Sequence, residues 1–488
     1  MSAGAPGELP VVVLMTSNGA GMGHLTRLAA VAAAAQQGRG FTAVLLSMSS
    51  ALPVVAAAIP AAARAEYCPG PTSGWMPVDV WHRYLSRRLV ALVREVGAST
   101  VVFDGTSPYP GLLAARRALP DLHLVWSRRG MWRPDASRAP LRSTGYFDEV
   151  VEPGDLAAAA DRGPTAGLTD VTRIAPVTVL ETLGLPGAPT AMPRSAARDA
   201  LGLDPDRPAM LVTLGAGHIN DPSAAIAAAA AAVLTDPSWQ VALTRAPLAL
   251  RDLPEAVRSR VTVLDRVFPL AAVLSAFDAA VSAAGYNAAH ELVLSGVPTL
   301  LVPNSATSTD DQVSRGRYLA ARGWALIAAE HDRVAITGAV AELLDAGVRA
   351  DLREAVSGLH RPTGASALAA AATRVAAAAA PRPLPRDRYV AVRGASAQVR
   401  RLVGEPTWER ARRLAGAPPR PPAARPTPVT QTLGVVPDGM RRLVVTSDLA
   451  DVTGSADTVV EHVLAGSSQE YMRQRRQIIT ATYDGARL

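Results

Sequence analysis

The chain has 488 residues, which is enough for two or three domains with complete cores, and its formal net charge is +7. All 49 basic residues are arginine, and the lack of lysine excludes Walker-type phosphate binding, Schiff-base chemistry and a pyridoxal phosphate enzyme. The single cysteine, Cys68, excludes an intramolecular disulfide and a cysteine-rich metal cluster.

Residues 1–10 carry no basic group ahead of their apolar run, so we expect no signal peptide. The alanine-rich runs at 224–234 and 367–380 are too short or too interrupted to span a bilayer. We therefore expect a cytoplasmic protein, and peripheral attachment to the inner face of the cell membrane stays open.

An apolar run at 11–15 leads into a glycine loop that ends in Gly21-Met22-Gly23-His24, and an alanine-rich stretch at 25–35 follows. This order is typical of a strand, a ligand-binding loop and a helix whose N-terminus attracts an anion. A dinucleotide site would require an acidic residue at the end of the next strand. The next predicted strand, 41–46, ends in Ser47-Met48-Ser49-Ser50, which argues against a nicotinamide or flavin dinucleotide.

The first half of the chain alternates strand and helix patterns, with strands predicted at 11–15, 41–46, 100–103, 122–126 and 149–152. This alternation predicts a mostly parallel sheet with helices on both faces. After a proline-bearing connector at 184–192 the second half repeats it. We predict strands at 209–214, 240–244, 261–264, 279–282, 298–302 and 324–328, and helices at 223–234, 286–295, 311–321 and 334–345.

A second glycine loop, Gly215-Ala216-Gly217-His218, follows the strand at 209–214. Two halves that each begin with a strand and a glycine loop predict an α/β protein. Its two Rossmann-like, doubly wound domains, 1–183 and 193–380, would face a central cleft, and 381–488 would form a C-terminal extension of unknown role.

This extension is basic and proline-rich, with 13 arginines and four acidic residues between 381 and 442, a local balance of +9. It fits either a solvated helix and linker or attraction to an anionic membrane surface or polymer. We predict a helix at 389–415, a strand at 443–446, and helices at 457–465 and 468–480.

The strongest chemical pattern runs from Gly285 to Glu291, where a predicted strand ends at a glycine and a helix begins. Glu291 lies one and a half turns into this helix. A carboxylate there can accept hydrogen bonds from ribose hydroxyls while the helix N-terminus meets phosphates. The alternative is a solvated carboxylate on an amphipathic helix.

Beyond Glu291 the chain continues with Gly296-Val297-Pro298, an apolar strand that ends at Pro303, and Asp311-Gln312. This pattern resembles the donor-binding region of GT-B glycosyltransferases. It is closest to the family of the peptidoglycan lipid-intermediate N-acetylglucosaminyltransferase, with its glycosyltransferase family 28-like C-terminal domain. The loop from Gly21 to Arg27 resembles the N-terminal loop of the same group, and the resemblance covers roughly 10 to 375.

The resemblance implies that a nucleotide-sugar binds mainly to the C-terminal domain. Gly285 and the backbone that follows, including Asn287, would meet the diphosphate, and Glu291 would hold the ribose. Asp311 and Gln312 would bind sugar hydroxyls, and His24 would face the reacting carbon. The loop glycines expected at the donor are Gly21, Gly23, Gly215 and Gly217, although the second loop departs from the Gly-Gly-Ser-x-Gly form of the family.

Asp104 ends the predicted strand at 100–103, and its side chain belongs at the same sheet edge as His24. A carboxylate that holds an imidazole in one tautomer makes it a better general base. The alternative is that Asp104 caps the helix near residue 110.

Together these residues and the resemblance predict an inverting glycosyltransferase that moves a sugar from a nucleotide-diphosphate donor to a hydroxyl of a lipid-linked or cell-envelope glycan. The resemblance implies a UDP-sugar as this donor. The alternatives are a nucleotide-sugar hydrolase of the same fold and a non-catalytic nucleotide-sugar-binding protein. We expect no cofactor, no metal and no nucleic acid partner. Asp204-Pro205-Asp206 looks like a metal-binding Asp-x-Asp motif, but its proline predicts a turn.

One further stretch, 75–88, mixes large apolar and basic side chains along a helix predicted at 78–96. Its apolar members either dock on an anionic membrane surface or pack into the N-terminal core. They are Trp75, Met76, Val80, Trp81, Tyr84 and Leu85.

Overall fold

The computed structural model describes residues 9–17, 22–49, 51–71, 77–186, 188–215, 221–245, 259–265 and 267–385, together with residue 410 and three short strands beyond it. Several predictions fall outside these residues. They concern Gly21, Gly217, Trp75, Met76, the helix at 468–480 and nearly all of the helix at 389–415.

Seven parallel strands form the N-terminal sheet, in the order β3-β2-β1-β4-β5-β6-β7. The central strands are continuous apolar runs because helices cover both faces of the sheet. The strands are β1 Val11–Thr16, β2 Thr42–Ser47, β3 Arg64–Tyr67, β4 Thr100–Asp104, β5 His123–Ser127, β6 Glu149–Pro153 and β7 Thr172–Ile174. The helices are α1 Gly23–Gln37, α2 Leu52–Ala58, α3 Val78–Val96 and α4 Pro110–Ala118, with 3-10 turns η2 Ala139–Tyr146, η3 Ala158–Ala160 and η4 Val179–Glu181.

Six parallel strands form the second sheet, in the order β10-β9-β8-β11-β12-β13. The strands are β8 Ala209–Thr213, β9 Gln240–Arg245, β10 Thr262–Asp265, β11 Ala279–Ser282, β12 Thr299–Leu301 and β13 Leu326–Ile327. The helices around it are α5 Arg194–Leu201, η5 Leu270–Ala276, α6 Ser223–Val233, α8 Tyr286–Leu294, α9 Gln312–Ala321, α10 Arg333–Leu344 and α11 Ala346–Val356.

Both sheets have the doubly wound strand order. In each domain the second and third strands lie on one side of the first strand, and the fourth strand lies on its other side. Ligands bind in such sheets at the carboxyl ends of these strands, here β1 and β4 in one domain and β8 and β11 in the other. This confirms the predicted fold class and every predicted strand of the two domains. The sequence missed β3 and β7, which are short strands at the edges of the first sheet.

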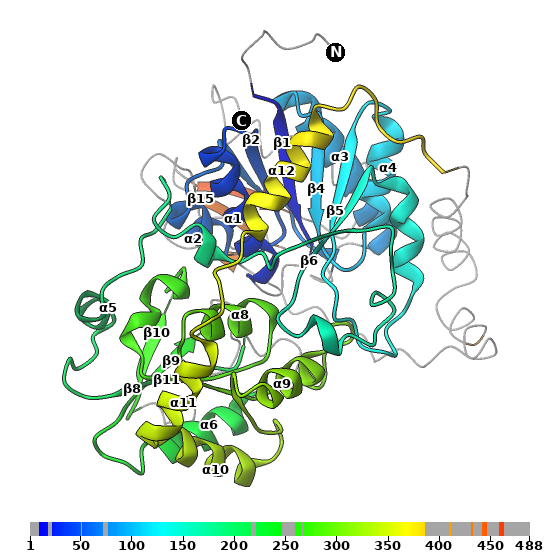
Figure 1. The fold of residues 1–488 in the computed structure, drawn as a ribbon. Coiled ribbons are helices and arrows are strands. Elements are labelled where there is room, and N and C mark those ends of the chain that lie inside the picture. Colours follow the sequence, from blue (N-terminus) through cyan, green and yellow to red (C-terminus); the bar gives the residue numbers. More distant parts are fainter. Residues whose placement is uncertain are drawn as a thin grey trace.

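The last helix of the two-domain body, α12 Gly364–Ala376, crosses back to the N-terminal domain. It packs along α1 and contacts β4, β5 and β6 (Figure 1, yellow). Both helices are rich in alanine, and their small side chains allow a close approach. The segment expected as the C-terminal domain, 193–380, therefore includes one helix that packs on the other domain.

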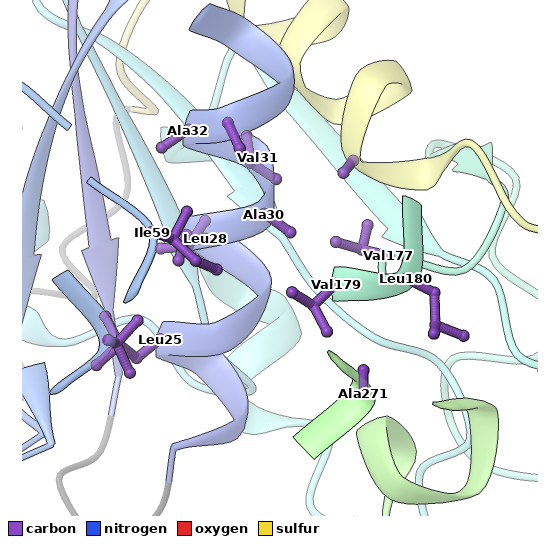
Figure 2. Packing of buried hydrophobic residues seen from close by; sticks show 14 of the residues in the cluster. Leu25, Leu28, Ala30, Val31, Ala32, Ile59, Val177, Val179, Leu180 and Ala271 are labelled. Atoms are coloured by element: carbon purple, nitrogen blue, oxygen red, sulfur yellow. The ribbon is translucent and has the colours of Figure 1, made fainter. Parts of the chain in front are cut away.

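One apolar cluster runs across the boundary between the domains. It joins Leu25, Leu28 and Val31 of α1 to residues around η4 and to Ala271 of η5 (Figure 2). The η4 region contributes Val177, Val179 and Leu180 to the same cluster. The two domains are thus joined by buried apolar surface on this side of α1.

The apolar side of α3 faces the N-terminal core rather than the surface. Val80, Trp81, Tyr84 and Leu85 are each at most 2% exposed, and Nε1 of Trp81 donates to the carbonyl of Pro69 at 2.7 Å. The membrane-docking interpretation of these four side chains is therefore wrong, because the sheet buries them. None of the helices in the described ranges is long and apolar enough to cross a membrane.

Within the C-terminal extension, three short strands form a small sheet in the order β14-β15-β16. Its strand β15, Arg442–Thr446, confirms the strand predicted at 443–446. The helix predicted at 457–465 is wrong, because Thr458–His462 forms the strand β16. The β-branched residues at its start favour this extended backbone. The third strand is β14 Gln431–Thr432.

Candidate functional site

His24 and Asp104 meet at the carboxyl edge of the N-terminal sheet. His24 is the second residue of α1, and Asp104 is the last residue of β4, paired with Thr16 at the end of β1. Nδ1 of His24 is hydrogen-bonded to Oδ1 of Asp104, and the hydroxyl of Ser127 donates to Oδ2 at 2.8 Å. The N-cap of α4 is Tyr109, so the alternative role of Asp104 as a helix cap is wrong.

The charges around this pair keep the carboxyl ionised and the imidazole neutral. Burial raises the pKa of Asp104, but the charge of Arg27 and the hydrogen bond from His24 outweigh burial and hold that pKa well below its usual range. Burial lowers the pKa of His24, Asp104 raises it, and the charges of Arg27 and Arg129 lower it further, so that the pKa lies below its ordinary value. When Nδ1–H donates to Asp104, the lone pair of Nε2 is available to accept a proton. The ring is 19% exposed.

Arg27, one turn after His24 on α1, is part of the same cluster. Its Nη2 and Nε donate to the two carboxylate oxygens of Asp104 at 2.5 and 3.2 Å. The sequence motif included Arg27 but gave it no role. The signal that could have identified Arg27 is its position three residues after His24, since residues three apart lie on one face of a helix.

On the C-terminal domain, the glycines lie where strands end and helices begin. Gly285 is the N-cap of α8 and follows β11, and Gly215 follows β8 with φ at +95°. Strands β8 and β11 are neighbours, so the two glycines belong to one edge of the sheet. A Cβ on Gly285 would lie 3.8 Å from Nε2 of Gln312, which places that amide beside the N-terminus of α8.

Glu291 is buried in the second turn of α8. Its side chain is only 8% exposed, and its Oε1 has no hydrogen-bond partner among the described residues. Burial raises the pKa of this carboxyl to about 8. The alternative interpretation as a solvated carboxylate is therefore wrong. A buried carboxyl without a partner is costly and is common at functional sites.

Asn287 lies in the first turn of α8, but its side chain contacts the N-terminal domain. Its Oδ1 accepts from Nη1 of Arg27 at 3.1 Å, and its Nδ2 donates to the carbonyl of Gly23 at 3.2 Å. Both polar atoms of the amide are thereby engaged across the domain boundary. Asn287 was expected among the donor-binding residues, and the structure places its side chain in a joint between the domains.

Two neighbours of Asn287 extend this joint. The hydroxyl of Tyr286 donates to the carbonyl of Gly154 at 2.9 Å and accepts from the backbone N–H of Val177 at 3.0 Å. Nε2 of His290 accepts from the N–H of Leu156 at 3.0 Å. The helix expected to bind the donor is therefore docked on the N-terminal domain along its first turn and into its second.

Asp311, which was expected at the sugar, and its neighbour Asp310 have different roles. Asp311 is the N-cap of α9 and accepts from the N–H of Ser314 at 3.0 Å. Its neighbour Asp310, which the sequence did not select, accepts from Arg129 at 3.3 Å and from Arg315 at 2.8 Å. Burial raises the pKa of Asp310, but Arg315 and Arg129 outweigh burial and hold that pKa well below its usual range.

Gln312 begins α9, and its Oε1 accepts from the N–H of Asn304 at 3.1 Å. This bond holds the amide toward Gly285. Gln312 thus lies beside the N-terminus of α8, and its contact with the sugar of a donor stays a prediction.

The segment Asp204-Pro205-Asp206, which looks like an Asp-x-Asp motif, forms a turn as predicted. Oδ1 of Asp204 accepts from the N–H of Asp206 at 2.9 Å. Across the parts of the chain that the structure describes, no group of three or more His, Cys, Asp or Glu side chains is arranged to hold a metal ion.

Comparison with known proteins identifies the fold of the chain but not its family. No family model and no curated protein matches the chain. The spinosyn forosaminyltransferase SpnP superposes with a TM-score of 0.52 at 17% identity, over 76% of this chain and all of the other (100%). MurG of Acinetobacter baumannii gives 0.50 at 15% identity, over 75% of this chain and 99% of the other.

A putative UDP-N-acetylglucosamine 2-epimerase from Listeria monocytogenes also gives a TM-score of 0.50, at 13% identity over 74% of this chain and 93% of the other. Identities this low establish the fold alone. The chain therefore has the GT-B fold of two facing Rossmann-like domains.

Proposed function

We propose that the protein is an inverting glycosyltransferase, which transfers a sugar from a nucleotide-diphosphate donor to an acceptor hydroxyl. One observation carries this proposal. The His24–Asp104 pair of one domain is hydrogen-bonded through Arg27 to the first turn of α8 in the other, the helix that also carries the buried carboxyl of Glu291. We therefore take the imidazole of His24 as the proton acceptor and the N-terminus of α8 as the nucleotide-binding part of one site.

The donor would bind at α8. The first N–H groups of a helix lack intrahelical partners, and with the helix dipole they favour a diphosphate. The Glu291 carboxyl would accept hydrogen bonds from the ribose hydroxyls, which would give its buried Oε1 the partner it lacks among the described residues. The resemblance of the sequence to a family that uses UDP-sugars favours uracil as the base.

His24 would act as the general base. Its Nε2 takes the proton of the acceptor hydroxyl as the oxygen attacks the anomeric carbon, and the bond from that carbon to the diphosphate breaks. Asp104 stabilises the imidazolium that forms, and the diphosphate leaves with its charge at the N-terminus of α8. A single displacement inverts the configuration at the anomeric carbon.

For the acceptor, we propose a lipid-linked or cell-envelope glycan, with the protein attached peripherally to the inner face of the membrane. This part rests on the sequence resemblance and on the basic residues 381–442, since the aromatic side chains of α3 are buried. Flotation with anionic vesicles tests it. Salt-sensitive association is expected, and no association even at low ionic strength would favour a soluble acceptor.

A nucleotide-sugar hydrolase is the second candidate. Its support is that a putative 2-epimerase of a UDP-sugar shares the fold, so the fold itself does not require transfer to an acceptor. Nucleotide release from a panel of nucleotide-sugars, followed with and without acceptors, separates the candidates. Complete release without an acceptor indicates hydrolysis, acceptor-dependent release indicates transfer, and binding without release indicates a non-catalytic protein.

A further inference from the structure

The guanidinium group of Arg27 is held from both domains at once. Nε and Nη2 donate to the carboxylate of Asp104 in the N-terminal domain, and Nη1 donates to Oδ1 of Asn287 in the C-terminal domain. The same Nη2 lies 2.8 Å from Nδ1 of His24. The side chain is buried. Its position beside the imidazole therefore depends on a residue of each domain.

Asn287 matches two different groups of the N-terminal domain. Its Oδ1 receives the Arg27 guanidinium, and its Nδ2 donates to the carbonyl of Gly23 at 3.2 Å. Gly23 directly precedes His24, so this carbonyl belongs to the peptide unit that leads into the proposed base. The amide supplies both an acceptor and a donor here, whereas a carboxylate would place negative charge against the carbonyl oxygen.

The docking of α8 fixes Asn287 in this place. The ring of Tyr286, the preceding residue, lies beneath two guanidinium groups, with Arg27 at 5.3 Å and Arg129 at 5.2 Å from its centroid. Tyr286 is anchored through its hydroxyl to the backbone of Gly154 and Val177. The first turn of α8 and the N-terminus of α1 are therefore positioned together.

From these contacts we infer that Arg27 and Asn287 are positioning residues, which set the orientation and charge environment of His24 across the domain boundary when α8 is docked. The inference rests on the proposed function only in that His24 is taken as the base. Its consequence is that the helix expected to bind the donor also controls the base.

Three charged groups surround His24: Asp104 on β4, Arg27 on its own helix, and Arg129 after β5. Burial has the largest effect and lowers the pKa of His24, Asp104 raises it, and the charges of Arg27 and Arg129 lower it further. Loss of the positive charge of Arg27 must then raise the pKa. Loss of Asn287 removes the acceptor of Nη1 of Arg27, so that the guanidinium group can move away from Nδ1 of His24. This movement also raises the pKa of His24.

The test is an NMR titration of His24 Cε1–H in the full chain without any substrate. The spectrum of His24→Gln identifies this signal among the eight histidines. We expect Arg27→Gln and Asn287→Ala to move the midpoint to higher pH, and Arg27→Lys, which keeps the charge, to stay closer to the wild type. The double variant Arg27→Gln/Asn287→Ala should move no further than Arg27→Gln alone, because both act through one guanidinium.

The matched control is Gln240→Ala. Gln240 is another buried amide of the C-terminal domain, and its hydrogen bonds go to Asp204 and Arg207 within that domain. Its loss should leave the titration of His24 unchanged. An unchanged midpoint in Asn287→Ala, or an equal shift in Gln240→Ala, overturns the inference.

Activity gives a second measurement. If the protein transfers sugar, Asn287→Ala should lower kcat by roughly tenfold, less than the loss of the base itself, with little change in the donor KM. A protein without any sugar transfer would contradict the proposed function, and the titration would still decide the inference.

Discussion

His24 and Asp104 are 80 positions apart in the chain, yet Nδ1 of the imidazole is hydrogen-bonded to a carboxylate oxygen of Asp104. The contact exists because β1 and β4 are adjacent parallel strands, so the loop after β1 and the end of β4 share one edge of the sheet. The carboxylate fixes the imidazole in one tautomer and directs its second nitrogen away from the pair. This geometry is the basis of the first prediction.

His24→Gln should lower kcat by about 10²–10⁴-fold, the usual loss when a general base is removed. The affinity for a nucleoside diphosphate should stay unchanged, because the imidazole would act on the acceptor. Steady-state kinetics and calorimetric titration with UDP measure the two quantities. His331→Gln is the control, since His331 is 82% exposed. Turnover close to the wild type in His24→Gln would remove His24 from the mechanism.

Above pH 8, where the Glu291 carboxyl is ionised, Glu291→Gln should weaken UDP binding by about 1–3 kcal/mol, which is the value of a hydrogen bond to a charged group. The glutamine keeps the volume of the side chain, removes the charge and replaces one acceptor oxygen by an NH2 donor. Calorimetry with UDP is sufficient, and Glu354→Gln, at an exposed position of α11, serves as the control. Equal affinities for wild type and Glu291→Gln would exclude a contact between this carboxyl and the nucleotide.

Glu291 should also make stability depend on pH. Its pKa of about 8 in the folded protein exceeds the ordinary value of 4.5, so the folded state holds this proton more tightly than the unfolded state does. The free energy of unfolding is therefore highest below the ordinary pKa and falls as the pH rises through 8, at about 1.4 kcal/mol per pH unit between these limits. Urea unfolding at pH 6 and pH 7 should show this decrease in the wild type relative to Glu291→Gln. Parallel pH dependence in both proteins would contradict it.

The neighbouring residues Asp310 and Asp311 should differ in their contribution to stability. Asp310→Asn removes the buried counter-charge of Arg129 and one of the two that Arg315 has, the other being Asp155, and should cost about 3 kcal/mol. Asp311→Ala removes a helix N-cap and should cost about 1 kcal/mol. Urea unfolding of the two variants measures the difference. A larger loss for Asp311→Ala would contradict the roles assigned here.

Much of the fold could be predicted from the sequence because the signals are local. The apolar runs that became β1, β4 and β11, and the glycines that follow them, are read from a few adjacent residues. The same applies to His24 and Asp104, which lie at predicted ends of a loop and a strand. The strand β16 was missed because a short segment of valine, glutamate and histidine fits either a helix or a strand.

The tertiary structure decided the roles of side chains whose partners are distant in the chain. Asp310 rather than Asp311 carries the ion pairs because the chain around Asp310 pairs with Trp132 of the other domain. Asn287 points across the domain boundary because Tyr286 docks on the backbone of Gly154. The aromatic residues of α3 are core residues because the N-terminal sheet covers them.

The sequence by itself thus determined two doubly wound domains, the shared sheet edge of His24 and Asp104, and the place of Glu291 on the helix after β11. Local propensity and period fix these features within each element. The structure alone decided that α12 returns to the first domain and that Arg27 and Asn287 join the two halves of the site. Those contacts depend on how the two domains pack against each other. The periodicity of apolar residues within one segment carries no information about that packing.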